Sequence, residues 1–443
     1  MTTTSEPTAR AEGARAANAP VRMTLVGKLA EGVALALLAT LVPRVLGPTE
    51  YGQFALVLAL VQVGATALAL GGHTAMSRFV PAAPAGDRAP LARALTVRLA
   101  LWRAPLFFGI AIVALALSVG LPDHVPPEIV GLALIALALD ATATMLAQAG
   151  LGLGQTTLWS FRWPLQTTVL VVGALVLSVP WGTTGAVAAI PISAFVAFAW
   201  TAAAVAPTLR RARAGASIPQ GAMRVAVQHG VSFLVTLTVA RAAIVVVALV
   251  AGAGASAEIG YAAVAVGIAL AGVAAVTQIF TVQLGGLSEH VGAGLRSVED
   301  EARRLARHAL AVALPAALVG AALLDPLTAI VLGEEFRPAT SALAWALAVL
   351  VLAPLSALTL QTSALRLRPG VRMRGALVSA VVFLATSFPL AIEFGAAGAL
   401  GALYGGTLVA IGYELMAFRS LLDRVVTLAG IGGSAVVLVL GLT

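Results

Sequence analysis

A few ionisable side chains lie inside long apolar stretches of this sequence, where a charge needs either a partner or a polar cavity. Arg241 stands in the run TVARAAIVVVALV, Asp140 in LIALALDATATML and Glu31 in KLAEGVALALLATLV. In hydrocarbon each such charge costs at least about 2.5–3.5 kcal/mol on insertion scales, so its presence favours a role in binding or transport. The chemistry that these residues predict is recognition of a charged cargo.

Patterns that would support catalysis or cofactor binding are missing. The sole lysine, Lys28, follows MTLVG and lacks the earlier glycine of a phosphate-binding loop, and the GLGLG run at 150–154 is typical of a turn between membrane helices. The five histidines show no metal-ligand spacing, and there is no cysteine. We therefore expect a protein that is not an enzyme, with no catalytic residue, no metal site and no cofactor.

Arg241 has two interpretations. The residues beside it on a helix are mostly apolar, and an offset of 208 residues places Glu31 opposite Val239, at nearly the same depth. In the first interpretation Arg241 faces a cavity and meets either Glu31 or an anionic cargo. In the second, Glu31 pairs with Lys28 three residues earlier, and Arg241 serves packing between helices.

Polar side chains also form stripes along apolar helices. Asp140, Thr144 and Gln148 follow one another at intervals of four residues, which places them on one helix face. Gln62 begins a similar stripe with Thr66 and His73. Such stripes either line a hydrophilic passage or join neighbouring helices. We favour the lining for Asp140, which is also the best candidate for a proton-coupled carboxylate.

Arginines near helix ends complete the candidate set. Arg44, Arg78 and Arg162 flank the expected mouths of a cavity, where they either contact cargo or extend to lipid headgroups. A series at intervals of five residues is spread around its helix and is interpreted as topology anchors; it consists of Arg88, Arg93, Arg98 and Arg103. Glu414 is expected to pair with a nearby arginine such as Arg419.

The elements that position these residues are membrane helices. The sequence is 60% hydrophobic and only 10% charged, with a mean hydropathy of +0.99. Its apolar runs of about 20 residues suit helices that cross a bilayer and do not alternate as barrel strands would. The predicted spans are 24–45, 52–71, 96–118, 128–150, 158–178, 184–206, 227–251, 259–283, 306–331, 339–363, 374–393 and 396–418.

The distribution of charge agrees with this count of twelve spans. With a cytoplasmic N-terminus, all but three of the 27 cations fall on the cytoplasmic side, and the exceptions are Arg44, Arg241 and Arg337. The formal charge of +8 is thus explained by membrane topology, and no nucleic-acid partner is expected. The loops on both sides are too short to hold a soluble catalytic domain. We expect a multi-pass protein of a bacterial plasma membrane.

The spans divide into two halves of equal orientation. The motif GPTEYGQFA at 47–55 recurs as ASAEIGYAA at 255–263, after the first helix of each half, which favours a duplication with parallel repeats. The expected division is a disordered tail (1–23), an N-terminal lobe of six helices (24–206), a basic linker (207–226), a C-terminal lobe of six helices (227–418) and a final segment (419–443). Within the last, 425–442 is either a thirteenth helix or an interfacial segment.

The first helical hairpin resembles the polysaccharide-exporter (Wzx-type) branch of the MOP flippase superfamily. The matching residues are Arg44, Leu46, Gly47, Glu50, Tyr51, Gly52, Phe54, Ala55 and Arg78. The resemblance implies an all-α membrane protein with two parallel-related six-helix lobes around a central cavity that opens alternately to each side. The cargo that it implies is an undecaprenyl-diphosphate-linked oligosaccharide, and the partners are membrane lipids and proteins of glycan assembly.

Three other functions fit a chain of this kind. A multidrug or metabolite exporter of the related antiporter families would share the helix count. An intramembrane glycan polymerase or ligase would normally need a sizeable outer loop with catalytic groups, and the outer loops here are short. A scaffold of a glycan-assembly complex is the third.

Overall fold

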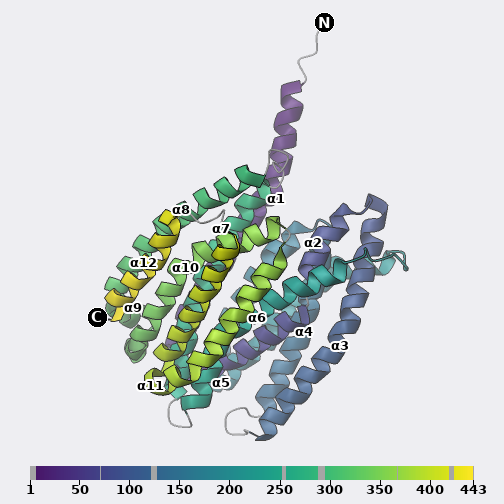
Figure 1. Cartoon of the computed structure of the whole chain (residues 1–443). Helices are drawn as coiled ribbons and strands as arrows, with labels where there is room; N and C mark the ends of the chain where they lie inside the picture. Colours follow the sequence, from purple (N-terminus) through teal and green to yellow (C-terminus); the bar gives the residue numbers. More distant parts are fainter. Residues whose placement is uncertain are drawn as a thin grey trace.

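The computed structural model describes residues 6–69, 71–120, 127–251, 256–287, 295–366, 368–418 and 424–442. Within these ranges the chain forms helices joined by turns, without a strand. The helices are α1 (Glu6–Ala69), α2 (Gly72–Ala82), α3 (Arg88–Gly120), α4 (Pro127–Gly152), α5 (Thr156–Arg211), α6 (Ala222–Ala251), α7 (Ser256–Leu287), α8 (Leu295–Ala322), α9 (Leu324–Val331), α10 (Thr340–Leu365), α11 (Pro369–Ala417) and α12 (Arg424–Leu442), with the 3-10 helices η1 (Ala85–Asp87) and η3 (Glu334–Ala339). Figure 1 shows them as one bundle of long helices.

Three of the long helices are divided by a glycine with positive φ. Gly47 in α1, Gly182 in α5 and Gly395 in α11 have φ of 72°, 53° and 57°. A Cβ added at Gly185 would lie 2.0 Å from the backbone oxygen of Leu177, eight residues earlier. In a straight helix such residues are about 12 Å apart, so the chain reverses direction at Gly182. The same close approach occurs after Gly395 in α11, between Gly398 and Leu390.

The bends account for the predicted number of spans. In the described part of the chain, nine helices are long and apolar enough to cross a membrane. Because three of these are each divided into two, the twelve predicted spans are all present as separate helical segments. The protein is thus a multi-pass, all-α membrane protein.

The N-terminal end of the chain differs from expectation, and the C-terminal end is helical, as in one of the two alternatives. Residues 6–23, which we expected within a disordered tail, are helical and form the start of α1, which projects from the bundle (Figure 1). Their alanine content favours helix. At the other end, α12 packs against α8 and α10, so 424–442 is a further helix of the bundle.

The helices pack as two groups. Helices α1–α5 contact one another, as do α6–α12, and the contacts between groups come mainly from α1 against α6 and α7 and from α2 against α6. The largest apolar cluster takes residues from both groups, such as Val42 and Phe54 of α1 and Val264 of α7. In two smaller clusters the buried residues come from one group each; one contains Met76 and the other Phe280.

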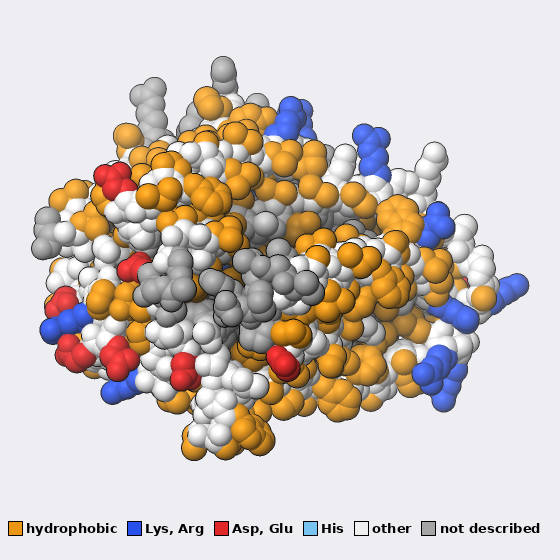
Figure 2. All heavy atoms as spheres, turned by 90° about the horizontal axis from the view of Figure 1, so that it is seen from below, with side chains coloured by type: hydrophobic (Ala, Val, Ile, Leu, Met, Phe, Trp, Pro, Cys, Tyr) orange, Lys and Arg blue, Asp and Glu red, His pale blue; other side chains and the backbone are white. Residues whose placement is uncertain are grey.

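The shared cluster lies toward the end of the bundle that the charge pattern assigns to the outside. It includes Leu332 and Phe336, next to the acidic turn that holds Glu334 and Glu335. Figure 2 shows acidic side chains gathered on the left of one face and basic ones mostly on the right, with a wide hydrophobic area between them. At the basic end the buried residues of the two groups form separate clusters, although Met223 of α6 packs against the cluster of Met76 and Gly71 meets the backbone of Ala226 closely. The two groups are therefore joined most firmly at the acidic end.

Candidate functional site

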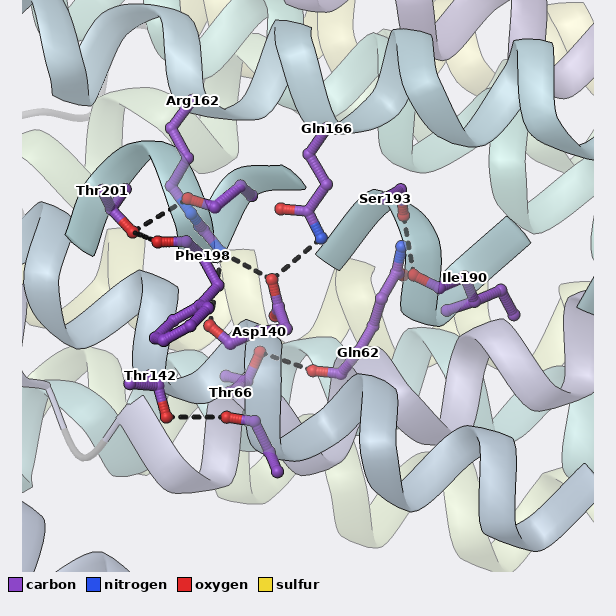
Figure 3. Close-up of polar contacts among 12 residues, drawn as sticks. Gln62, Thr66, Asp140, Thr142, Arg162, Gln166, Ile190, Ser193, Phe198 and Thr201 are labelled. Carbon is purple, nitrogen blue, oxygen red and sulfur yellow. Dashed lines mark hydrogen bonds and ion pairs between the residues drawn. The ribbon is translucent and has the colours of Figure 1, made fainter. Parts of the chain in front are cut away.

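A buried ion pair occupies the interior of the N-terminal group. Nη2 of Arg162 donates to Oδ1 of Asp140 at 2.5 Å, and Nε2 of Gln166 donates to the same oxygen at 2.9 Å. Arg162 and Gln166 are four residues apart on α5, so both reach one carboxylate on α4 (Figure 3). Arg162 is fully buried at 0% exposure and its guanidinium lies 4.0 Å from the ring centroid of Trp163. Of the two alternatives for Arg162, extension to lipid headgroups is therefore wrong.

The pair changes the interpretation of Asp140. Both partners are removed from solvent, and a buried charge that loses its partner is costly. Asp140 thus holds α4 to α5, and its neighbours on the stripe behave similarly: Thr144 is buried, and Gln148 accepts a hydrogen bond from α3. The stripe joins helices, which was the second of the two alternatives. Nε and Nη1 of Arg162 have no hydrogen-bond partner among the described residues.

Arg241 bridges the two groups. Its Nη2 donates to Oε1 of Gln62, which lies in the second half of α1. No described carboxylate pairs with Arg241, and its buried Nε has no hydrogen-bond partner there. Arg241 is therefore a cation between α6 and α1. The amide of Gln62 accepts one of its hydrogen bonds but does not compensate its positive charge.

Glu31 does not meet Arg241. Nζ of Lys28 donates to Oε2 of Glu31 at 2.6 Å, within the first half of α1. The spacing of three residues places both side chains on one helix face. Glu31 therefore pairs with Lys28 on its own helix and not with the distant Arg241. The hypothesis of a contact between Glu31 and Arg241 is wrong, and the alternative, a pair with Lys28, is confirmed.

Arg103 is a buried residue that sequence reasoning assigned to the surface. Its Nη2 donates to the backbone oxygen of Ala69 at 2.8 Å and to Oε1 of Gln148 at 3.3 Å. It is 6% exposed, so its interpretation as a topology anchor is wrong. Arg103 satisfies a carbonyl at the end of α1, where carbonyls lack helical partners. The sequence does contain one signal of this burial, because Arg103 lies further into the apolar run than Arg98.

The remaining candidates lie near the surface. Arg44 is exposed, and its Nη1 donates to the backbone oxygen of Ile330 at 2.9 Å, which joins α1 to α9 across the two groups. Arg78 is exposed in α2, with its guanidinium 5.9 Å from the Phe79 ring centroid. Neither is brought together with Arg241 or Arg162 by a hydrogen bond or ion pair of the described residues.

The C-terminal group holds a comparable buried pair. Nη1 of Arg372 donates to both carboxylate oxygens of Glu414, at 2.9 and 2.8 Å, and Thr359 donates to Oε2. Glu414 is 1% exposed. Its partner is thus Arg372, whereas the expected partner, Arg419, lies outside the described residues. Arg162 and Arg372 stand near the starts of α5 and α11, the bent helices of the two groups.

The interior chemistry is that of cations, amides and hydroxyls. In the described ranges, no group of three or more His, Cys, Asp or Glu side chains could hold a metal ion. Two cations inside the apolar helices, Arg103 and Arg241, are matched by amide or carbonyl oxygens and not by carboxylates. This arrangement can stabilise an anion that reaches the contact between the groups.

Solved structures share this fold. The lipid II flippase MurJ in an inward closed conformation matches with a TM-score of 0.63 and 11% identity, over 94% of this chain and 91% of that chain. A multidrug resistance MATE family transporter of the MOP superfamily, in an inward-facing conformation, matches with a TM-score of 0.62 and 14% identity, over 90% and 95%. The Vibrio cholerae MATE transporter VcmN in the bent form gives 0.59 and 17%, over 93% and 96%.

No family profile matches the chain, and no curated protein is similar in sequence. The likeness is therefore one of fold, extending over nearly the whole chain. The fold is thus shared with a lipid II flippase and with MATE transporters.

Proposed function

We propose that this protein flips an undecaprenyl-diphosphate-linked oligosaccharide from the cytoplasmic to the outer leaflet of a bacterial plasma membrane, by alternating access, for the synthesis of cell-surface polysaccharide. Its N-terminus is cytoplasmic in this proposal, and proteins of glycan assembly are its partners. The shared fold supports a transporter or flippase, and the resemblance of the first hairpin to the Wzx-type branch supports the cargo.

The observation that carries the proposal is the position of Arg241. It lies between the two helix groups, within membrane-spanning segments, and its recorded hydrogen bond goes to the neutral amide of Gln62. A diphosphate supplies the negative charge that this guanidinium lacks, and arginine binds phosphate oxygens with parallel hydrogen bonds. A diphosphate cannot cross hydrocarbon without such compensation.

The packing of the groups supports alternating access. They share an apolar core at the acidic end and have separate clusters of buried residues at the basic end. Arg241 lies at the edge of the shared core nearest the basic end, beside Val239 and Ala240, so a cargo entering from the basic, cytoplasmic side would meet it there. Rocking of two parallel-related lobes would then open the other end.

Export of drugs or metabolites is the second candidate, because most of the matched structures are MATE transporters. The uncompensated charge of Arg241 separates the two candidates. It repels a cationic compound and attracts a phosphorylated one, so it favours the lipid-linked cargo.

The test is a flipping assay in proteoliposomes that contain a fluorescent undecaprenyl-diphosphate oligosaccharide. Loss of fluorescence to a membrane-impermeant quencher reports the fraction of cargo in the outer leaflet. We expect the wild-type protein to accelerate the exchange between leaflets, and Arg241→Gln to slow it by about tenfold or more, as for a lost charge-assisted hydrogen bond. The matched control is Arg337→Gln, which removes an exposed arginine near the acidic end.

Two results would contradict the proposal. One is a wild-type rate equal to that of empty liposomes, together with transport of a cationic dye by the same preparation. The other is full flipping by Arg241→Gln at normal protein content, which would remove the assigned role of Arg241 even if the cargo were correct.

A further inference from the structure

A cavity of about 600 Å³ opens between the two helix groups at the basic end of the bundle. Its walls are α3, the linker 212–221 between α5 and α6, and the first turn of α6. Two arginines and several apolar side chains line it: Arg98, Val97, Leu101, Ile218, Met223 and Arg224. This cavity is separate from the contact between Arg241 and Gln62.

The cavity lies at the level of the lipid headgroups in the membrane. The guanidinium of Arg98 lies 5.9 Å from the ring centroid of Trp102, which is 41% exposed. Beyond Trp102, α3 presents exposed apolar side chains such as Phe108 and Ile112. Tryptophan concentrates at the boundary between hydrocarbon and water, so Arg98, one turn before Trp102, lies on the polar side of that boundary, and Leu101 lies beside Trp102 at the boundary itself.

The charges in the cavity are not balanced by the protein. Arg98 and Arg224 are exposed, and no salt bridge joins either of them to an acidic residue in the described part of the chain. The residues that line the cavity include no Asp or Glu. Two guanidinium groups beside an apolar wall match a molecule with a phosphate at one end and hydrocarbon at the other.

We propose that this cavity binds one anionic phospholipid of the cytoplasmic leaflet. Arg98 and Arg224 hold its phosphate, and its acyl chain follows Val97 and Leu101 toward the bilayer. Anionic lipids are attracted to basic pockets on the cytoplasmic side. The inference is independent of the cargo proposed above.

The lipid would link the two helix groups. Arg98 belongs to α3 of the N-terminal group, whereas Arg224 begins α6 of the C-terminal group. The linker between them is already fixed to α3, because Nη1 of Arg93 donates to the backbone oxygen of Ala212 at 2.5 Å. A bound lipid would therefore restrain the start of α6, the helix that carries Arg241.

The experiment measures lipids retained by the full chain after purification from nanodiscs of phosphatidylglycerol and phosphatidylethanolamine in equal amounts, by native mass spectrometry. We expect the wild type to retain one phosphatidylglycerol in preference to phosphatidylethanolamine. Arg98→Gln with Arg224→Gln should lower this retention, by about fivefold for each arginine. The matched control, Arg368→Gln with Arg374→Gln, removes two exposed cytoplasmic arginines of the C-terminal group and should retain the lipid.

A second variant tests shape without changing charge. Ala216 lines the cavity from the linker, so Ala216→Trp should occupy part of it and obstruct the lipid while all arginines remain. Three results would overturn the proposal: retention unchanged in the Arg98/Arg224 variant, equal loss in the control pair, or displacement of the signal by millimolar inorganic phosphate, which would indicate a site for a free anion.

Discussion

The carboxylate of Glu258 accepts the backbone N–H of Ala396 at 2.9 Å, immediately after the bend glycine Gly395 of α11. The carboxylate thus satisfies one of the free N–H groups at the start of the second half of α11. In the other group, a Cβ added at the bend glycine Gly182 would lie 3.7 Å from Oε2 of Glu50. The two acids of the repeated Glu-x-Gly motif therefore occupy matching positions beside the bends.

Replacing Glu258 should destabilise the bend of α11. Glu258→Ala leaves the Ala396 N–H without its acceptor, and the loss of such a cap typically costs about 1 kcal/mol. We expect a lower thermal unfolding midpoint in detergent. Glu393→Ala, which removes an exposed acid close to the same bend, serves as the control and should leave the midpoint unchanged. Equal midpoints for the two variants would show that the hydrogen bond contributes nothing.

Gly260, in the same motif, should tolerate no side chain. A Cβ at this position would lie 2.0 Å from the backbone oxygen of Pro48, so α7 and α1 could not approach as they do. Gly260→Ala should therefore lower the folded yield and the unfolding midpoint. The comparison is Gly267→Ala on the same helix, whose Cβ would meet its nearest neighbour, the Cβ of Ala39, at 3.9 Å and should be accepted. A Gly260→Ala protein as stable as Gly267→Ala would contradict the close contact.

The pair of Asp140 and Arg162 should behave as a unit. Arg162→Met leaves a buried carboxylate without its cation, and breaking a buried pair in this way costs about 3–5 kcal/mol. The double variant Arg162→Met with Asp140→Leu removes both charges and should recover most of the lost stability. The measurement is thermal unfolding of all three variants, including Asp140→Leu alone. If the two single changes add without recovery in the double variant, the pair has no coupling.

The sequence predicted the helices well because their signal is local. Each span is an apolar run, the three reversals of direction fall at glycines, and the positive charges alternate between the sides. The motif at Glu50 and Glu258 also indicated two related halves before any contact was known. These features depend on residues close in the chain, which a single sequence displays.

The partners of the buried charges were predicted poorly because they come from different helices. Arg162 and Asp140 are on α5 and α4, and Arg103 meets the end of α1. Their packing decides which arginine is buried, and helical periodicity does not show it. The exception was Glu31, whose partner Lys28 is three residues away on the same helix and was named as one of two alternatives.

The hydrogen bond between Arg241 and Gln62 offers a way to separate the candidate cargoes. Gln62→Glu places a carboxylate where the amide oxygen now accepts from Arg241. This partner would compete with a diphosphate for the guanidinium, so flipping of a lipid-linked oligosaccharide should fall by about tenfold, while the protein remains folded. Gln53→Glu makes the same change at an exposed position of α1 and should leave the rate unaltered.

An exporter of cationic compounds predicts the opposite result for Gln62→Glu. Neutralising Arg241 would remove a repulsion, and transport of a cationic dye by proteoliposomes should then increase. The two assays on one preparation therefore give different directions for the two functions. Slower flipping with unchanged dye movement supports an anionic cargo at Arg241, whereas faster dye movement with no effect on flipping favours a cationic cargo at this position.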